Sequence, residues 1–289
     1  MGHSGSKSSL PPPERPEFTS PWRPMTWEIL VVGEVGAGKS SFINSVINTF
    51  QRRVTSRALY KTHYIEGEDG SPLPFVFNDS MGLEREEGGA RSEDIISAMK
   101  GFLQEGHKFN PLSPVSPNDP GYRSNPSTED QTFCLVNIIA ADKVSLMHDD
   151  VFAKLKRIRE EATNLNLPQV IIMTRPDIAC PLVHSDLRKL YYSRKIKDKM
   201  QECSNRLGIP MNHIFPVKNY HEEIDTMNDM DFLILKALDQ IVNVAADAVQ
   251  QPSFKSSSQH EYGWDRLLYG RKSGSKAGGG DCRCERRIS

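Results

Sequence analysis

The sequence predicts an α/β fold of three layers, in which helices flank both faces of a mostly parallel sheet. Short apolar runs alternate with longer amphipathic segments, and the first run is followed by a glycine-rich turn that leads directly into a helix pattern. The runs are nearly continuous in apolar residues, as strands buried on both faces are. The expected strands are residues 29–32, 73–77, 133–140, 170–173 and 214–217.

Apolar residues at helical spacing predict helices over residues 42–50 and 151–162. A final helix is marked by Phe232, Leu235, Leu238, Ile241 and Val242. Residues 1–25 are rich in Ser and Pro, and residues 251–289 are rich in Ser, Gly and basic residues. We therefore expect a domain over residues 26–250 between a flexible leader and a flexible basic tail. Prolines spread through residues 106–130 predict a long surface insertion.

Composition narrows the range of functions. The chain has 289 residues, and its 36 Lys and Arg nearly balance 37 Asp and Glu, which leaves a net charge of -1. No overall field attracts nucleic acid, so we expect no nucleic-acid partner. Five cysteines without a double CxxC spacing indicate a reduced, cytoplasmic setting. No apolar run approaches the ~18 residues of a membrane span.

The strongest motif is GEVGAGKS at residues 33–40, which matches the phosphate-binding pattern GxxxxGK[ST]. Backbone N–H groups of such a loop and of the helix that follows it surround a polyanion. Lys39 would contact the β and γ phosphates, and the Ser40 hydroxyl would bind Mg²⁺. The candidate phosphate-binding residues in this segment are Gly33, Val35, Gly36, Ala37, Gly38, Lys39, Ser40 and Ser41.

A second motif, Asp79-Ser80-Met81-Gly82, follows the strand at 73–77. Its aspartate would hold the hydration shell of Mg²⁺, and the Gly82 N–H would contact the γ-phosphate. Fast GTPases place Gln directly after this motif to orient water, but this chain has Leu83. Leucine cannot hydrogen-bond water, so hydrolysis by this protein alone should be slow, and whether it is an enzyme stays open.

The loop after the first helix should supply a second hydroxyl to the metal. Thr55 and Thr62 are both candidates, and the sequence does not decide between them. An ordinary loop or strand role is the alternative for each. The candidate metal-binding residues are Ser40, Asp79 and Thr62.

A third motif, Thr174-Arg175-Pro176-Asp177, follows the strand at 170–173 and is a variant of [NT]KxD. The Asp177 carboxylate would accept hydrogen bonds from both N–H groups on the edge of guanine, and Arg175 could cover the face of the base. Adenine offers no such pair of donors. Lys218 follows the last strand, where a short loop would meet the guanine oxygen. The candidate guanine-binding residues are therefore Thr174, Arg175, Asp177 and Lys218, with GTP or GDP and Mg²⁺ as cofactors.

Taken in order at strand ends, these motifs indicate a P-loop GTPase-type domain. Across residues 27–250, the runs GEVGAGKSSFINSV, FNDSMGLE and VIIMTRPD resemble the interferon-induced protein 44 family, including its 44-like member. The resemblance implies a cytoplasmic, interferon-inducible protein of the antiviral immune response with a GTP-binding domain. Longer members of the family carry an additional N-terminal domain, where this chain has a short leader.

Both ends of the chain carry weak membrane signals. The segment MGHSGS fits the N-myristoylation pattern with Gly2 as acceptor, and a single such chain binds membranes only marginally. The basic tail, with Cys282 and Cys284 available for acylation, could add a second signal. A solvated leader and tail are the alternative.

The leading functional hypothesis is a GTP-dependent switch or assembly module with slow intrinsic hydrolysis, unknown protein partners and nucleotide-dependent self-association. A P-loop ATPase or kinase is one alternative, although it would leave Asp177 without a role. An interaction scaffold that does not cycle is the other.

Overall fold

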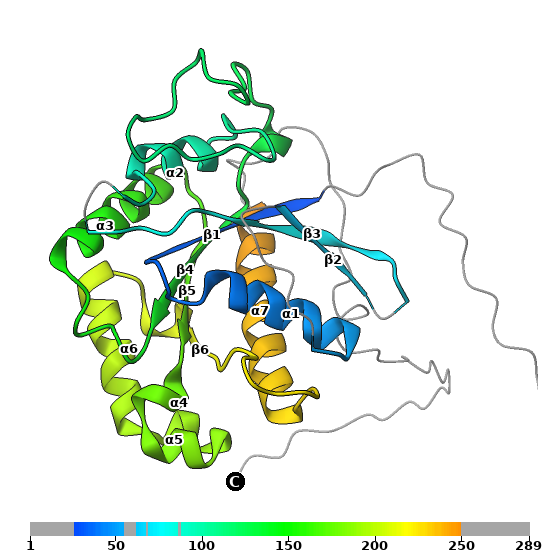
Figure 1. Ribbon diagram of the computed structural model, residues 1–289, viewed down its shortest axis with the longest axis vertical. Helices are drawn as coiled ribbons and strands as arrows, with labels where there is room; N and C mark the ends of the chain where they lie inside the picture. The colour runs from blue at the N-terminus through cyan, green and yellow to red at the C-terminus, as the bar shows by residue number, and fades with distance from the viewer. Residues whose placement is uncertain (1–25, 55–61, 68, 86–87, 250–289) are drawn as a thin grey trace, which may run out of the picture.

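The computed structural model describes residues 26–54, 62–67, 69–85 and 88–249, which form one six-stranded sheet between two layers of helices (Figure 1). The strands lie in the order β2-β3-β1-β4-β5-β6. All neighbours pair in parallel except β2, which runs antiparallel to β3 at the edge of the sheet. The predicted α/β fold class is confirmed.

Five of the strands are those expected from the sequence. They are β1 (Trp27–Gly33), β3 (Pro72–Asp79), β4 (Cys134–Ala140), β5 (Gln169–Thr174) and β6 (Ile214–Pro216). Every residue of β4 is buried, which explains why an apolar run predicted this strand so well. The edge strand β2 (Thr62–Glu66) was not predicted. Only His63 and Ile65 are buried in it, so it has the alternating pattern of a half-covered strand.

Two helices, α1 (Lys39–Gln51) and α7 (Asn228–Val249), pack on each other across one face of the sheet (Figure 1). The predicted final helix is confirmed as α7, but Phe232 is not part of its buried face. That side chain is 67% exposed, because the buried stripe runs through Ile234, Leu238 and Ile241 at helical spacing.

The other face carries α2 (Ser92–Met99), α3 (Asp149–Asn164) and α6 (Arg194–Leu207). Two short helices, α4 (Pro176–Ala179) and α5 (Pro181–Ser185), and the 3₁₀ segments η2 (Leu187–Tyr192) and η3 (Met211–His213) connect β5 to α6 and α6 to β6. Residues 106–130 contain turns and end in the 3₁₀ segment η1 (Thr128–Asp130). In the described ranges, no helix combines the length and apolarity that crossing a membrane requires.

Glu28 is an unusual residue for the central strand β1, whose other side chains are apolar. It is partly buried, and the Asn78 Nδ2 group donates a hydrogen bond to its Oε2 atom over 3.1 Å. Burial raises the pKa of Glu28 from the ordinary 4.5 to about 7, against the opposing effect of that hydrogen bond. An ionised Glu28 therefore destabilises the folded chain.

The Glu28→Gln variant is expected to be more stable than the wild type above about pH 7 and nearly equal to it at about pH 4.5. Because the pKa is higher in the folded than in the unfolded chain, the wild type loses stability as pH rises between these values. Glutamine does not ionise, so the variant avoids a loss of up to about 3 kcal/mol. Urea unfolding at several pH values measures the difference, with the exposed Glu66→Gln as control. A difference that does not change with pH would contradict the assignment.

Candidate nucleotide-binding site

The site is built where β1 ends and α1 begins. Gly38 is the N-cap of α1 with φ 94°, a left-handed conformation that favours glycine. No side chain caps this helix, and no acidic residue stands in its first turn. The first-turn N–H groups of a helix have no partner within it, and they carry the positive end of its dipole. This helix end is therefore suited to binding an anion.

Lys39 lies over the loop with only 8% of its surface exposed. Its Nζ atom donates to the carbonyl oxygens of Gly33 over 3.3 Å and of Glu34 over 3.4 Å. Burial lowers the pKa of Lys39, while the nearby Asp79 and Glu34 carboxylates oppose this shift. A buried ammonium group gains most from an anionic ligand, so its position matches the predicted phosphate contact.

Ser40 and Asp79 meet across the loop, because the Ser40 hydroxyl donates to the Asp79 Oδ2 atom. Burial raises the pKa of Asp79, and the hydrogen bond from Ser40 and the charge of Lys39 oppose this. The Asp79 Oδ1 atom is buried and has no hydrogen-bond partner among the described residues. A hydroxyl and an unsatisfied carboxylate oxygen fit Mg²⁺, which typically takes one or two protein oxygens together with phosphate and water.

The segment after Asp79 is joined to the phosphate loop by backbone hydrogen bonds. The Leu83 N–H donates to the Gly33 carbonyl over 2.9 Å, and the Val35 N–H donates to the Leu83 carbonyl over 3.0 Å. The Ala90 N–H holds the Gly82 carbonyl from the other side over 2.9 Å. Gly82 thus lies against the loop, as its predicted role requires. Leu83 is fully buried, so its side chain cannot reach a water molecule at the phosphate.

On the base side, the end of β5 is tied to the phosphate loop. Thr174 is fully buried, and its Oγ1 atom donates to the Ala37 carbonyl over 2.6 Å. It therefore supports the loop. Arg175 follows in a left-handed conformation with φ 56°, and its Nη1 atom lies 3.9 Å from the Asp142 Oδ2 atom. Asp177 is partly exposed in the first turn of α4.

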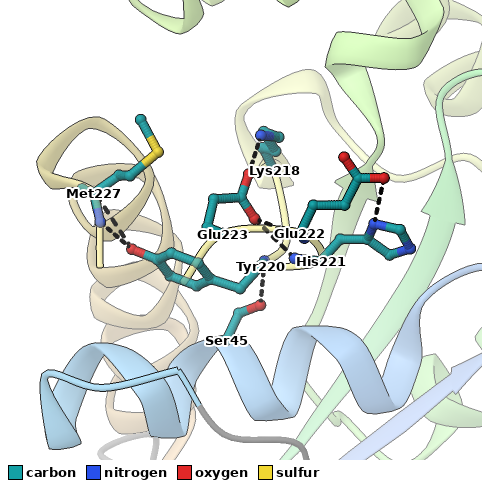
Figure 2. Close-up of polar contacts among 7 residues, drawn as sticks. All are labelled: Ser45, Lys218, Tyr220, His221, Glu222, Glu223 and Met227. Atoms are coloured by element: carbon teal, nitrogen blue, oxygen red, sulfur yellow. Dashed lines mark hydrogen bonds and ion pairs between the residues drawn. The ribbon is translucent and has the colours of Figure 1, made fainter. Parts of the chain in front are cut away.

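The loop after β6 is fixed by a local network (Figure 2). The Lys218 ammonium pairs with Glu223, whose carboxylate also accepts from the His221 N–H over 2.9 Å. Burial alone would raise the pKa of Glu223, but these hydrogen bonds together lower it to about 2. The Tyr220 N–H donates to Ser45 Oγ over 2.9 Å and so anchors the loop to α1. Lys218 is thus engaged within its own loop.

Three residues that are not among the candidate site residues lie beside the phosphate loop or beside Arg175. Asn219 donates from Nδ2 to the Gly38 carbonyl over 3.1 Å. The Lys143 Nζ atom lies 3.6 Å from where a Cβ on Gly36 would stand. The Oδ1 atoms of Asn219 and Asp142 are buried without a hydrogen-bond partner in the described part of the chain. Each follows a strand whose carboxyl end faces the site, which is the signal that could have identified them.

Thr62 is the first residue of β2, and its hydroxyl donates to the Asn78 Oδ1 atom over 2.8 Å. The structure therefore brings Ser40 and Asp79 together but directs the Thr62 hydroxyl to Asn78. The alternative threonine, Thr55, lies outside the described residues, and so do Gly2, Cys282 and Cys284.

No protein-family model matches the chain. Interferon-induced protein 44 from Homo sapiens is 33% identical over 239 residues, which cover 78% of this chain and 54% of that protein. Interferon-induced protein 44-like from Homo sapiens is 29% identical over 235 residues, with coverages of 77% and 52%. The Mus musculus interferon-induced protein 44 is 29% identical over 236 residues, with coverages of 77% and 55%. The chain thus spans about half the length of the curated relatives it matches.

Similar solved structures include a probable GTP-binding protein engB, with a TM-score of 0.44 and 11% identity, covering 76% of this chain and 99% of that one. Translation elongation factor SelB from Methanococcus maripaludis, in complex with the GTP analogue GPPNHP, has a TM-score of 0.40 and 8% identity, with coverages of 77% and 34%.

Proposed function

Because this chain is a homologue of interferon-induced protein 44 over about three quarters of its length, we propose that it is a guanine-nucleotide-binding protein of the interferon-induced antiviral response. Its GTP-bound form would act as a switch or an assembly module. The observation that carries the proposal is the set of buried polar groups around one loop. A lysine ammonium and three oxygens without a hydrogen-bond partner among the described residues, on Asp79, Asp142 and Asn219, stand at or just after the ends of β1, β3, β4 and β6.

The phosphate end of the proposed site is the loop at residues 33–40 together with the start of α1. Lys39 would contact the terminal phosphates, and the first-turn N–H groups of α1 would donate to the remaining phosphate oxygens. Ser40 and Asp79 would hold Mg²⁺, which neutralises charge on the phosphates when bound. Lys143 adds a second cation near the loop.

The base end of the proposed site rests on Asp177 and Arg175. Thr174 ties the segment that carries them to the phosphate loop, so the base and phosphate contacts would belong to one pocket. Asp177 would accept from the guanine edge, and the partly exposed Arg175 side chain would cover the base. Hydrolysis would be slow, because the buried Leu83 stands where a water-orienting side chain is needed.

The remaining parts of the proposal concern the whole protein. It would self-associate when nucleotide is bound and would have other protein partners. It would be cytoplasmic, with weak membrane attachment through Gly2 and the basic tail. These parts do not depend on the described residues, and each would need its own assay in cells.

Titration of the full chain with GTP and with ATP, both with Mg²⁺, tests the nucleotide assignment. We expect GTP to bind at least about 100-fold more tightly, since two hydrogen bonds to a charged group each contribute about 1.5–3 kcal/mol. Asp177→Asn should weaken GTP binding by a similar factor and favour xanthosine triphosphate. The exposed Asp198→Asn on α6 is the matched control and should change neither affinity. Equal affinity for GTP and ATP in the wild type would reject the guanine assignment and support an ATPase or kinase.

A further inference from the structure

A cavity of about 650 Å³ lies on one face of the sheet, over the edge formed by β1, β3 and β2. Helices normally cover both faces of a parallel sheet. Here the roof is formed by Ala98 of α2 and by residues 103–109, which precede most of the proline-rich insertion. The volume is within the usual range for small-molecule sites.

The register of the three strands explains the floor of the cavity. Val76 of β3 lies opposite Glu28 of β1 and Tyr64 of β2, so these three form one row. A second row is formed in the same way around Asn78, which is opposite Leu30 and Thr62. Side chains two residues apart along a strand share a face. The floor therefore consists of Glu28, Leu30, Thr62, Tyr64, Val76 and Asn78.

Glu28 is the charged group at the base of this floor. Thr62 donates to Asn78 over 2.8 Å, and Asn78 donates to Glu28 over 3.1 Å, so this chain of hydrogen bonds ends at the carboxylate. Among the described residues, Asn78 is its one side-chain donor. The nucleotide site does not use Glu28, and a carboxylate in a central parallel strand is otherwise unfavourable.

His107 provides a second unsatisfied group in the same cavity. Both of its ring nitrogens are buried, and neither has a hydrogen-bond partner within the described ranges. The ring is held edge-on against Phe109, with 5.6 Å between the ring centroids. Buried polar atoms are nearly always hydrogen-bonded, so these ring nitrogens are available to a molecule that enters the cavity.

The charge of Arg123, which lines the cavity, lowers the pKa of Glu28 against the larger effect of burial, but among the described residues no cation forms an ion pair with Glu28. Arg123 donates to the Gly101 carbonyl over 2.9 Å and forms an ion pair with Asp130 at 3.1 Å. Lys108 is exposed to solvent. Glu105 accepts a hydrogen bond from the Tyr64 hydroxyl over 3.1 Å and adds a second negative charge at the rim. The cavity thus combines a buried acid, an acidic rim and apolar walls.

We propose that this cavity binds a small organic amine, whose ammonium group pairs with Glu28 and whose apolar body packs on Leu30, Val76 and Phe109. A ring nitrogen of His107 would form a further hydrogen bond with such a ligand. The site is distinct from the nucleotide pocket, because Lys39 and Ser40 do not line it among the described residues. Two candidate nucleotide-site residues, Asp79 and Thr62, also line it, and the Thr62 hydroxyl is directed to Asn78.

The test uses three probes that share a biphenyl body: biphenyl-4-ylmethylamine, biphenyl-4-ylmethanol and biphenyl-4-carboxylate. Their affinities for the full chain are measured at pH 8 by ligand-observed NMR titration. We expect the amine to bind at least about tenfold more tightly than the alcohol, because its ammonium group would form one charge-assisted contact with Glu28 that the alcohol lacks. The carboxylate should bind most weakly.

Four variants locate the effect. Glu28→Gln should remove the preference for the amine over the alcohol, while the rim variant Glu105→Gln should keep most of it. Phe109→Ala should weaken the binding of the amine and of the alcohol by the same factor. Lys39→Ala should leave all three affinities unchanged, so the result is independent of the nucleotide assignment. Equal binding of amine and alcohol, a preference unchanged in Glu28→Gln, or no binding of any probe would overturn the proposal.

Discussion

Replacing Lys39 by alanine is expected to weaken GTP binding by about 100-fold or more. The Lys39 ammonium is buried over the phosphate loop, 3.3 Å from the Gly33 carbonyl oxygen, and its contacts to the terminal phosphates would be charge-assisted. Losing about 3 kcal/mol of such contacts corresponds to that factor. Isothermal titration with GTP and Mg²⁺ measures the affinity directly.

The same variant separates a binding role from a structural one. Burial already lowers the pKa of Lys39, so its removal should not reduce the melting temperature of the nucleotide-free chain. Lys156→Ala removes an exposed lysine on α3 and is the matched control, with no expected change in affinity. Unaltered GTP binding by Lys39→Ala would show that the loop does not hold the nucleotide. A scaffold that does not cycle would then be the better hypothesis.

Replacing Gly33 by alanine is expected to destabilise the fold by about 3 kcal/mol or more and to abolish nucleotide binding. A Cβ atom at this position would stand 2.3 Å from the Ile138 carbonyl oxygen in β4. That oxygen belongs to the backbone of a fully buried strand, so the clash can be relieved only by separating β1 from β4. Urea unfolding gives the free energy of unfolding, and GTP titration gives the affinity.

Gly106→Ala is the graded control for this prediction. Gly106 has φ 81°, but nothing lies within 4 Å of its added Cβ, so the cost should be about 1 kcal/mol from the left-handed backbone alone. If Gly33→Ala were no more destabilising than this control, the close approach of the two strands at the loop would be wrong.

The sequence predicted the strands and helices that are strongly apolar, and it missed those that are not. The fully buried strand β4 is a continuous apolar run, and the buried stripe of α7 has apolar residues at helical spacing, so both are recognisable in the sequence. The edge strand β2 alternates over only five residues. Helix α6 is mostly polar and buries only Ile196, Cys203 and Leu207, so its apolar pattern is sparse. Such elements are specified by the surface they cover, which a single sequence does not show.

For the candidate site, the sequence motifs identified the residues but not what each side chain contacts. Thr174 was assigned to the base, yet its hydroxyl supports Ala37, because the end of β5 lies directly beside the phosphate loop. Lys218 was assigned to the base as well, and it pairs with Glu223. The order of the strands in the sheet brings Asn219 and Lys143 to the phosphate loop and Asp142 to Arg175.

The backbone hydrogen bonds that join Leu83 to Gly33 and Val35 hold together the two segments that we propose contact phosphate, residues 33–40 and residues 79–83. An incoming nucleotide would not need to order them, so little of its binding free energy is lost to chain entropy there. Departure of a terminal phosphate would, for the same reason, alter the local charge around Gly82 more than its position. A partner that contacts this region would therefore distinguish the protein with and without the terminal phosphate by its electrostatic potential.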